Sequence, residues 1–158
     1  PQMANFEMDG FEFDRTESRA KADWETLKDL RNLWQGQLVV KGVTNAEDAQ
    51  QLKAEGVDAI QVSNHGARQL ESAPAPIHAL ERIRAAVGSE YPLFYDSGLR
   101  NGEDVLKAFD QGANYTFFGR ILQFAIAAAG EEGLYRLWDI LTAEFSRAMA
   151  QPGRDKLI

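Results

Sequence analysis

Apolar and polar positions follow each other in regular blocks from about residue 38 onward. Four short apolar stretches rich in β-branched or aromatic residues predict β-strands. They lie at 38–42 (LVVKG), 59–66 (AIQVSNHG), 93–100 (LFYDSGLR) and 115–120 (YTFFGR). Each stretch is followed by a segment whose apolar residues recur at helical spacing. The pattern therefore predicts a strand–helix unit that is repeated four times.

The expected helices have recognisable start and stop signals. Thr44 to Glu47 forms a capping box ahead of a helix that ends near Gly56. A second helix ends at Gly88, and Asn101 caps a third helix that ends at Gly112. After the fourth strand we expect a small apolar helix and then a long one.

Two further segments precede the first strand. Trp24, Leu27, Leu30 and Trp34 are spaced as on a helix, with Asp23 as its N-cap and Gly36 after its end, so a helix is expected at about 24–34. Residues 1–22 are polar and lack periodicity, so we interpret them as a loop or lead-in segment.

Alternating strands and helices are typical of an α/β fold with a parallel sheet and right-handed crossovers. The strands are almost entirely apolar, as expected where both faces of a sheet are covered. A (β/α)₈ TIM barrel needs roughly 250 residues, whereas this chain has 158. We therefore expect residues 23–158 to form four βα units, half of such a barrel; an open four-stranded sheet is the alternative.

Composition narrows the function classes. The chain is 44% hydrophobic, so it can bury a core, and it has no cysteine for a disulfide or a thiolate metal site. A net charge of −7 opposes non-specific nucleic-acid binding. No apolar run is long enough for a transmembrane segment, and the first residues do not resemble a signal peptide. We expect a cytoplasmic protein, with peripheral attachment to the inner membrane as the alternative.

Polar residues gather just after each predicted strand. They are Lys41, His65 with Arg68, Asp96 with Arg100, and Arg120. The carboxyl ends of parallel strands lie at one edge of a sheet, which is where α/β folds bind ligands. These residues are therefore expected to form one site.

The segment from Ser63 to Gln69 contains the most reactive combination. A neutral imidazole such as that of His65 can take a proton near pH 7, and the guanidinium of Arg68 can bind a carboxylate through two parallel hydrogen bonds. Together they suit an acidic substrate that loses a proton beside its carboxylate; an incidental histidine and arginine in a surface loop are the alternative. The other histidine, His78, is expected on the surface of a helix.

The loops after the third and fourth strands have the composition of a phosphate site. Asp96-Ser97-Gly98-Leu99-Arg100 and Phe118-Gly119-Arg120 combine glycine with arginine. Glycine allows the backbone to approach an anion, and a helix N-terminus attracts it. Phosphate sites recur on the last two strands of TIM barrels.

At these residues the sequence resembles the FMN-dependent α-hydroxy acid dehydrogenases and oxidases, which include lactate dehydrogenases, glycolate oxidases and mandelate dehydrogenases. The matching segments include WETLKDLRNLWQGQLVVKG, DAIQVSNHGARQL, DSGLRNGEDVLKAFDQGA and FGR. The string VSNHG-x-RQL is highly specific to this family. The resemblance covers the C-terminal half of such an enzyme.

The resemblance implies a role for each site residue. His65 would be the active-site base and Arg68 the partner of the substrate carboxylate, with both also contacting the cofactor. Lys41 would lie beside flavin N1 and O2, and Ser63 would line the flavin. The residues around the ribityl chain and phosphate would be Asp96, Ser97, Gly98, Arg100, Gly119 and Arg120. One departure is Ala67, which occupies a position where the family usually has glycine and whose methyl group would crowd the loop.

The resemblance thus implies FMN-dependent oxidation of a lactate-like L-2-hydroxy acid to a 2-oxo acid, with no metal ion. The expected partners are the small substrate, the N-terminal half of the barrel and further copies in a homo-oligomer. The chain by itself is expected to be inactive. The main alternative is a non-catalytic half-barrel that binds phosphate or flavin weakly, or self-associates. Another FMN- or phosphate-binding barrel of different chemistry is a weaker alternative.

Overall fold

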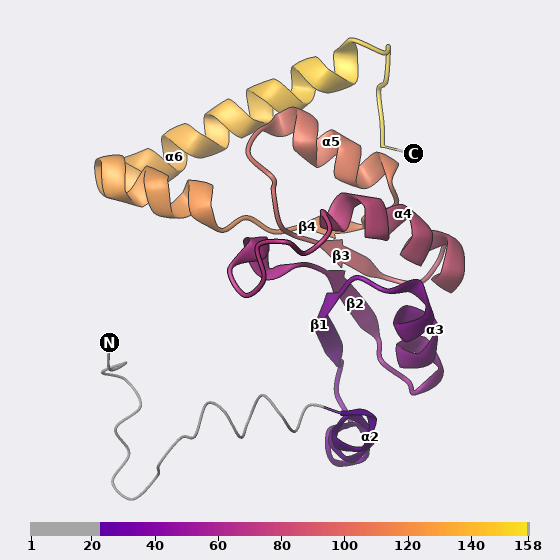
Figure 1. Cartoon of the computed structure of the whole chain (residues 1–158). Coiled ribbons are helices and arrows are strands. Elements are labelled where there is room, and N and C mark those ends of the chain that lie inside the picture. Colours follow the sequence, from indigo (N-terminus) through magenta and orange to yellow (C-terminus); the bar gives the residue numbers. More distant parts are fainter. Residues whose placement is uncertain (1–22, 158) are drawn as a thin grey trace, which may run out of the picture. The chain divides into compact units, whose positions relative to one another are not determined.

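The computed structural model describes residues 23–157 (Figure 1). The chain divides into two compact units, one that ends at Gln35 and one that comprises Gly36–Ile158. The predicted lead-in at residues 1–22 lies outside the described residues, so the domain boundary placed after it stays a prediction.

The first unit contains helix α2 (Trp24–Leu33). Asp23 is its N-cap, as predicted, because the backbone N–H of Thr26 donates to Asp23 Oδ1 at 2.9 Å. The helix ends one residue earlier than expected, because Trp34 has an extended backbone.

The second unit contains a four-stranded parallel sheet in the order β1-β2-β3-β4. The strands are β1 (Val39–Val43), β2 (Ala59–Val62), β3 (Leu93–Tyr95) and β4 (Tyr115–Thr116). Consecutive parallel neighbours with crossovers of one hand place the connecting helices on one face of the sheet. Helices α3 (Ala46–Ala54), α4 (Pro76–Val87) and α5 (Gly102–Asp110) indeed lie on one side of it (Figure 1).

Three strand predictions were too long at their carboxyl ends. The predicted strands at 59–66, 93–100 and 115–120 stop at Val62, Tyr95 and Thr116. The chain leaves the sheet because the next residues turn sharply: residues 65–67 form the 3₁₀ turn η1 (His65–Ala67), and Ser97 and Gly98 have positive φ angles. Where the sheet ends, these turns carry the polar side chains away from it.

The core lies between the sheet and its helices. Ile60 on β2 pairs in register with Leu93 on β3, and both are fully buried, as are Leu80 and Ile83 on α4. The N-cap of α3 is Asn45, whose side chain accepts from the N–H of Glu47. The predicted capping box beginning at Thr44 was therefore displaced by one residue.

Helix α6 (Arg120–Ala150) combines the two helices expected after the fourth strand. Its backbone is non-helical at Ala129 and Gly130, so a short helix precedes a long one, as predicted. The long part packs closely on α5, since a Cβ atom at Gly102 would lie 2.1 Å from the backbone nitrogen of Phe145.

The other face of the sheet is not covered by helices α3, α4 or α5. Lys41, Gln61, Phe94 and Tyr115 are adjacent in register and form one row across this face. Phe94 also contacts Phe117 edge to face, with ring centroids 5.8 Å apart. Tyr115 is 59% exposed. The row thus begins with a cation and ends in an exposed aromatic cluster.

Candidate active site

A cavity of about 910 Å³ lies at the carboxyl ends of the strands. Nine of the ten predicted site residues line it, namely Lys41, His65, Arg68, Asp96, Ser97, Gly98, Arg100, Gly119 and Arg120. The tenth, Ser63, is 1% exposed and hydrogen-bonds to Lys41. The structure therefore brings together residues that were predicted from four separate loops. His78 lies on α4, where it is exposed, as expected.

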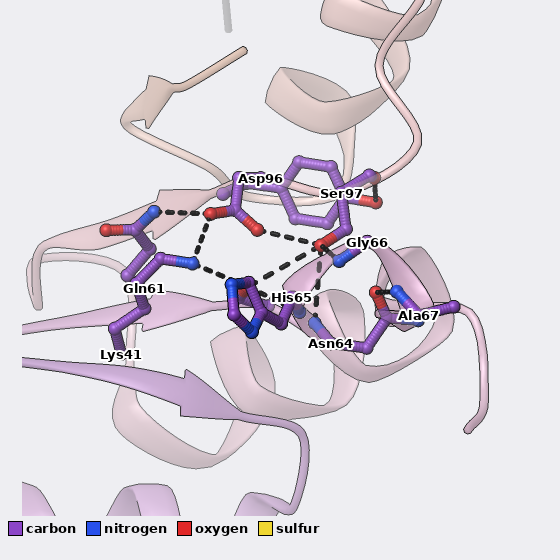
Figure 2. Close-up of polar contacts among 10 residues, drawn as sticks. Lys41, Gln61, Asn64, His65, Gly66, Ala67, Asp96 and Ser97 are labelled. Atoms are coloured by element: carbon purple, nitrogen blue, oxygen red, sulfur yellow. Dashed lines mark hydrogen bonds and ion pairs between the residues drawn. The ribbon is translucent and has the colours of Figure 1, made fainter. Parts of the chain in front are cut away.

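The ammonium group of Lys41 is held by residues that directly follow β2 and β3 (Figure 2). Its Nζ lies 2.6 Å from Asp96 Oδ2 and donates to Ser63 Oγ at 3.0 Å. Gln61 Nε2 donates to the same Asp96 oxygen at 2.7 Å. The side chain of Lys41 is still 47% exposed, so the ammonium remains accessible to a ligand in the cavity.

Asp96 is held as a carboxylate. Burial favours its neutral form, but hydrogen bonds from Lys41, Ser63 and Ser97 and the charge of Lys41 outweigh burial and lower the pKa of Asp96. Tyr95 has the opposite shift: burial, followed by the charges of Asp96 and Asp104, raises its pKa to about 12. Tyr95 therefore stays neutral and donates to the carbonyl of Ser97 at 2.9 Å.

The loop that bears His65 is bonded to both neighbouring serines (Figure 2). The N–H of His65 donates to Ser63 Oγ at 3.0 Å. The N–H groups of Asn64 and Gly66, one on each side of His65, donate to Ser97 Oγ at 3.3 and 3.1 Å. The backbone around His65 is thus fixed by hydroxyl groups from two strand ends.

Backbone strain is concentrated at this site. Among residues 23–157, the non-glycine residues with positive φ are His65 (57°), Ala67 (61°) and Ser97 (83°). A left-handed backbone disfavours residues with a Cβ, and such strain tends to occur at functional sites. The departure noted at Ala67 therefore also has a backbone consequence, because glycine adopts this conformation readily.

The two glycine–arginine loops that line the cavity can accept an anion. The backbone at Gly98 and Gly119 is uncovered, since a Cβ atom at either residue would meet nothing within 4 Å apart from its neighbours in the chain. Gly119 is the N-cap of α6 and provides no side-chain hydrogen bond to its first turn. With the exposed guanidiniums of Arg100 and Arg120, these N–H groups suit a phosphate. The donor set therefore fits a phosphate-bearing cofactor such as FMN.

Sequence reasoning missed Gln61 and the apolar wall of the cavity. Gln61 is a polar residue within an apolar strand, in register with Lys41, and this position was the available signal. Phe117, Phe118, Ile121 and Phe124 line the cavity beside the arginines. By composition alone, their side chains are indistinguishable from core residues of the sheet and of α6.

Comparison with known proteins agrees with this geometry. The sequence profile of the FMN-dependent dehydrogenases matches residues 2–157. The chain belongs to this family. It is 40% identical over 161 residues to (S)-mandelate dehydrogenase of Pseudomonas putida, covering 97% of this chain and 40% of that relative. It is 44% identical over 130 residues to 2-hydroxyacid oxidase 1 of Mus musculus, covering 82% and 35%.

Solved structures support the same assignment. A structure of mandelate oxidase with (S)-2-phenylpropionate has a TM-score of 0.78 and 39% identity, covering 84% of this chain and 40% of that one. This confirms the predicted fold class, four βα units of a TIM barrel, and the family match confirms the resemblance and its FMN dependence. The chain spans about two fifths of the length of these relatives. Within residues 23–157, none of the helices has the length and apolarity needed to cross a bilayer.

Proposed function

We propose that this chain provides the base, the carboxylate-binding arginine and the phosphate-binding loops of an FMN-dependent enzyme that oxidises an L-2-hydroxy acid to a 2-oxo acid. The observation that carries the proposal is that His65, Arg68, Lys41 and both glycine–arginine loops line one cavity. Membership of the FMN-dependent dehydrogenase family supports it. A lactate-like substrate is the finer form of this proposal.

The reaction removes two electrons and two protons from the substrate. FMN, when bound, would accept both electrons together with one of the two protons, and the other proton would go to His65. His65 is exposed to the cavity and takes a proton from the substrate. Arg68 lies three residues further along the same turn and binds the carboxylate with its planar guanidinium, which sets the substrate's orientation toward His65.

The remaining residues would hold the cofactor. Gly98, Arg100, Gly119 and Arg120 supply uncovered N–H groups and positive charge for the phosphate. Lys41 supplies a cation that favours added negative charge on the flavin ring. Because Lys41 is paired with Asp96 in a half-buried network, its position is fixed before any ligand binds.

The test uses His65→Gln, with His78→Gln as the matched control on α4. The chain is combined with a separately produced polypeptide of a mandelate dehydrogenase that carries the other βα units. Flavin reduction by lactate, glycolate or mandelate is then followed anaerobically. We expect His65→Gln to retain FMN and lose substrate-driven reduction, while His78→Gln behaves like the parent chain.

The non-catalytic half-barrel is the second candidate, favoured by the exposed aromatic side chains on the sheet face that α3, α4 and α5 do not cover. It predicts that the parent chain binds FMN or phosphate weakly but shows no substrate-driven reduction in any combination. Unchanged reduction by the His65→Gln variant would remove this histidine from the role of base.

A further inference from the structure

The hydroxyl of Ser97 lies between the Lys41–Asp96 ion pair and the turn that bears His65. On one side it donates to Asp96 Oδ1 at 2.7 Å, and Asp96 holds Lys41 through its other oxygen. On the other side it accepts from the N–H groups of Asn64 and Gly66. One oxygen atom therefore connects the Lys41–Asp96 ion pair to the turn that bears His65 (Figure 2).

The direction of these bonds is set by charge. Asp96 is held as a carboxylate, so it can only accept, and the single hydroxyl proton of Ser97 must point toward it. The lone pairs of Ser97 Oγ are then left to face the two amides. Hydrogen bonds arranged in such a chain strengthen one another.

Ser97 holds this position despite an unfavourable backbone. Its φ of 83° is one that glycine adopts without strain. Glycine at 97 would relieve the backbone but would remove the hydroxyl and its bonds to Asp96, Asn64 and Gly66. The local conformation therefore favours glycine, whereas the contacts require a hydroxyl.

We propose that Ser97 is a positioning residue that fixes the orientation of His65 by holding the backbone amides on both sides of it. In naming His65 as the base, this inference rests on the proposed function. It assigns to Ser97 a role toward the histidine turn that is separate from contact with the cofactor. The same hydroxyl also fixes the position of that turn relative to Lys41, which would lie beside the flavin.

The test compares Ser97→Ala and Ser97→Gly in the full chain by nuclear magnetic resonance. Alanine removes the hydroxyl and keeps the strained backbone, whereas glycine removes both. The chain has two histidines, so the ring of His78 on α4 is an internal control. Ser89→Ala is the matched variant, because the Ser89 hydroxyl donates to Glu90 in an exposed loop.

We expect exchange of the Gly66 amide to become at least tenfold faster in both Ser97 variants. The His65 ring signal should shift or broaden while that of His78 stays in place. Ser89→Ala should change neither histidine signal. A purely local stabilising role would instead leave the His65 signal unchanged when Ser97→Gly folds with the parent's melting temperature.

An unchanged Gly66 exchange rate and an unchanged His65 signal in either folded variant would overturn the proposal. If Ser97→Ala does not fold, Ser97→Gly decides, since its backbone is relieved; failure of both to fold would assign Ser97 to the fold and reject positioning. The measurement needs neither FMN nor substrate. A selective His65 response in a chain that shows no substrate-driven flavin reduction when the complementary βα units are added would therefore contradict the proposed function and leave the positioning role intact.

Discussion

Replacing Ala67 with glycine should stabilise the chain, although the change removes a methyl group. Ala67 has a φ of 61°, and a left-handed backbone costs a residue with a Cβ about 1–2 kcal/mol. Glycine avoids this strain but loses roughly 0.5–1 kcal/mol more through the greater freedom of its unfolded chain. The N–H of residue 67 keeps its bond to Asn64 Oδ1. The free energy of unfolding should therefore rise by about 0.5–1 kcal/mol.

The measurement is urea unfolding of the two chains, supported by thermal melts. For a chain of this size the melting temperature should rise by roughly 1–4 °C. Ala143→Gly is the matched control, because Ala143 is exposed in the middle of the long part of α6. The same chemical change should there lower stability by about 1 kcal/mol.

Opposite signs for the two substitutions would locate the strain in the folded turn. If Ala67→Gly destabilises the chain as much as Ala143→Gly does, the turn is not strained and the conformational argument for the whole His65 loop fails. A stabilised variant with unchanged unfolding slope in urea would confirm that the folded state, rather than the compactness of the unfolded chain, has changed.

Three other side chains give predictions of their own. The pKa of Asp96 is lowered in the folded chain, so its ionised form should stabilise the fold above about pH 4, and this effect should be lost as the pH falls through the pKa of the folded state. Asp96→Asn should therefore reduce the change in the free energy of unfolding on the acid side of a pH series. An unchanged pH dependence would contradict this. Arg84 donates to the carbonyls of Tyr91 and Gly112 and to Asn114 Oδ1. Arg84→Lys should therefore lower the free energy of unfolding in urea by about 2–3 kcal/mol, because these acceptors lose their partners. A loss below about 0.5 kcal/mol would show that these hydrogen bonds do not stabilise the fold. Arg68→Lys should weaken binding of a 2-hydroxy acid at least tenfold, because lysine cannot make the two-point contact with the carboxylate. Arg82→Lys, at an exposed position, is the control. If a substrate titration gives the Arg68→Lys chain the same affinity as the parent chain, Arg68 does not bind the carboxylate.

The fold was predictable from the sequence because its signals are local. Apolar runs, helix caps such as Asp23 and Asn101, and glycine stops are each read within a few residues. The ends of the strands were not predictable in this way. Ser63, Asn64 and Gly66 signal a turn after the apolar run, but the residue type at position 65 does not indicate the left-handed conformation that His65 adopts.

The sequence predicted which residues line the candidate site, but not which of them bond to each other. Placing polar residues after parallel strands correctly predicted that Lys41 and Arg120 would line one cavity. Which atoms bond to which depends on strand register and on turn geometry. The bonds of Gln61 to Asp96 and of Ser97 to the His65 turn therefore emerged only from the structure, because they join residues more than thirty positions apart.

The chain alone, residues 1–158 without a second polypeptide, should not turn over any 2-hydroxy acid. The base, the carboxylate-binding arginine and the phosphate loops are all on this chain, so the reason is geometric. In the part of the chain that the structure describes, β1 and β4 are sheet edges, and the row from Lys41 to Tyr115 lies on the face that helices α3, α4 and α5 do not cover. Oxidation requires the reacting carbon to be held within roughly 3–3.5 Å of its partner, and a ligand on such an uncovered face remains accessible to water.

Flavin fluorescence titration and dye-coupled oxidation of several 2-hydroxy acids test this together. Weak FMN binding should survive, because Gly98, Arg100, Gly119 and Arg120 lie on two neighbouring loops of this chain. Turnover should appear only when the complementary βα units are added. Robust turnover by a sample that mass spectrometry shows to contain this chain alone would contradict the geometric argument.

Because all four strands run parallel, a two-fold axis along the barrel could place β4 of one copy beside β1 of the other. An active sample should then run as a dimer on a sizing column, with two copies of the chain building the site.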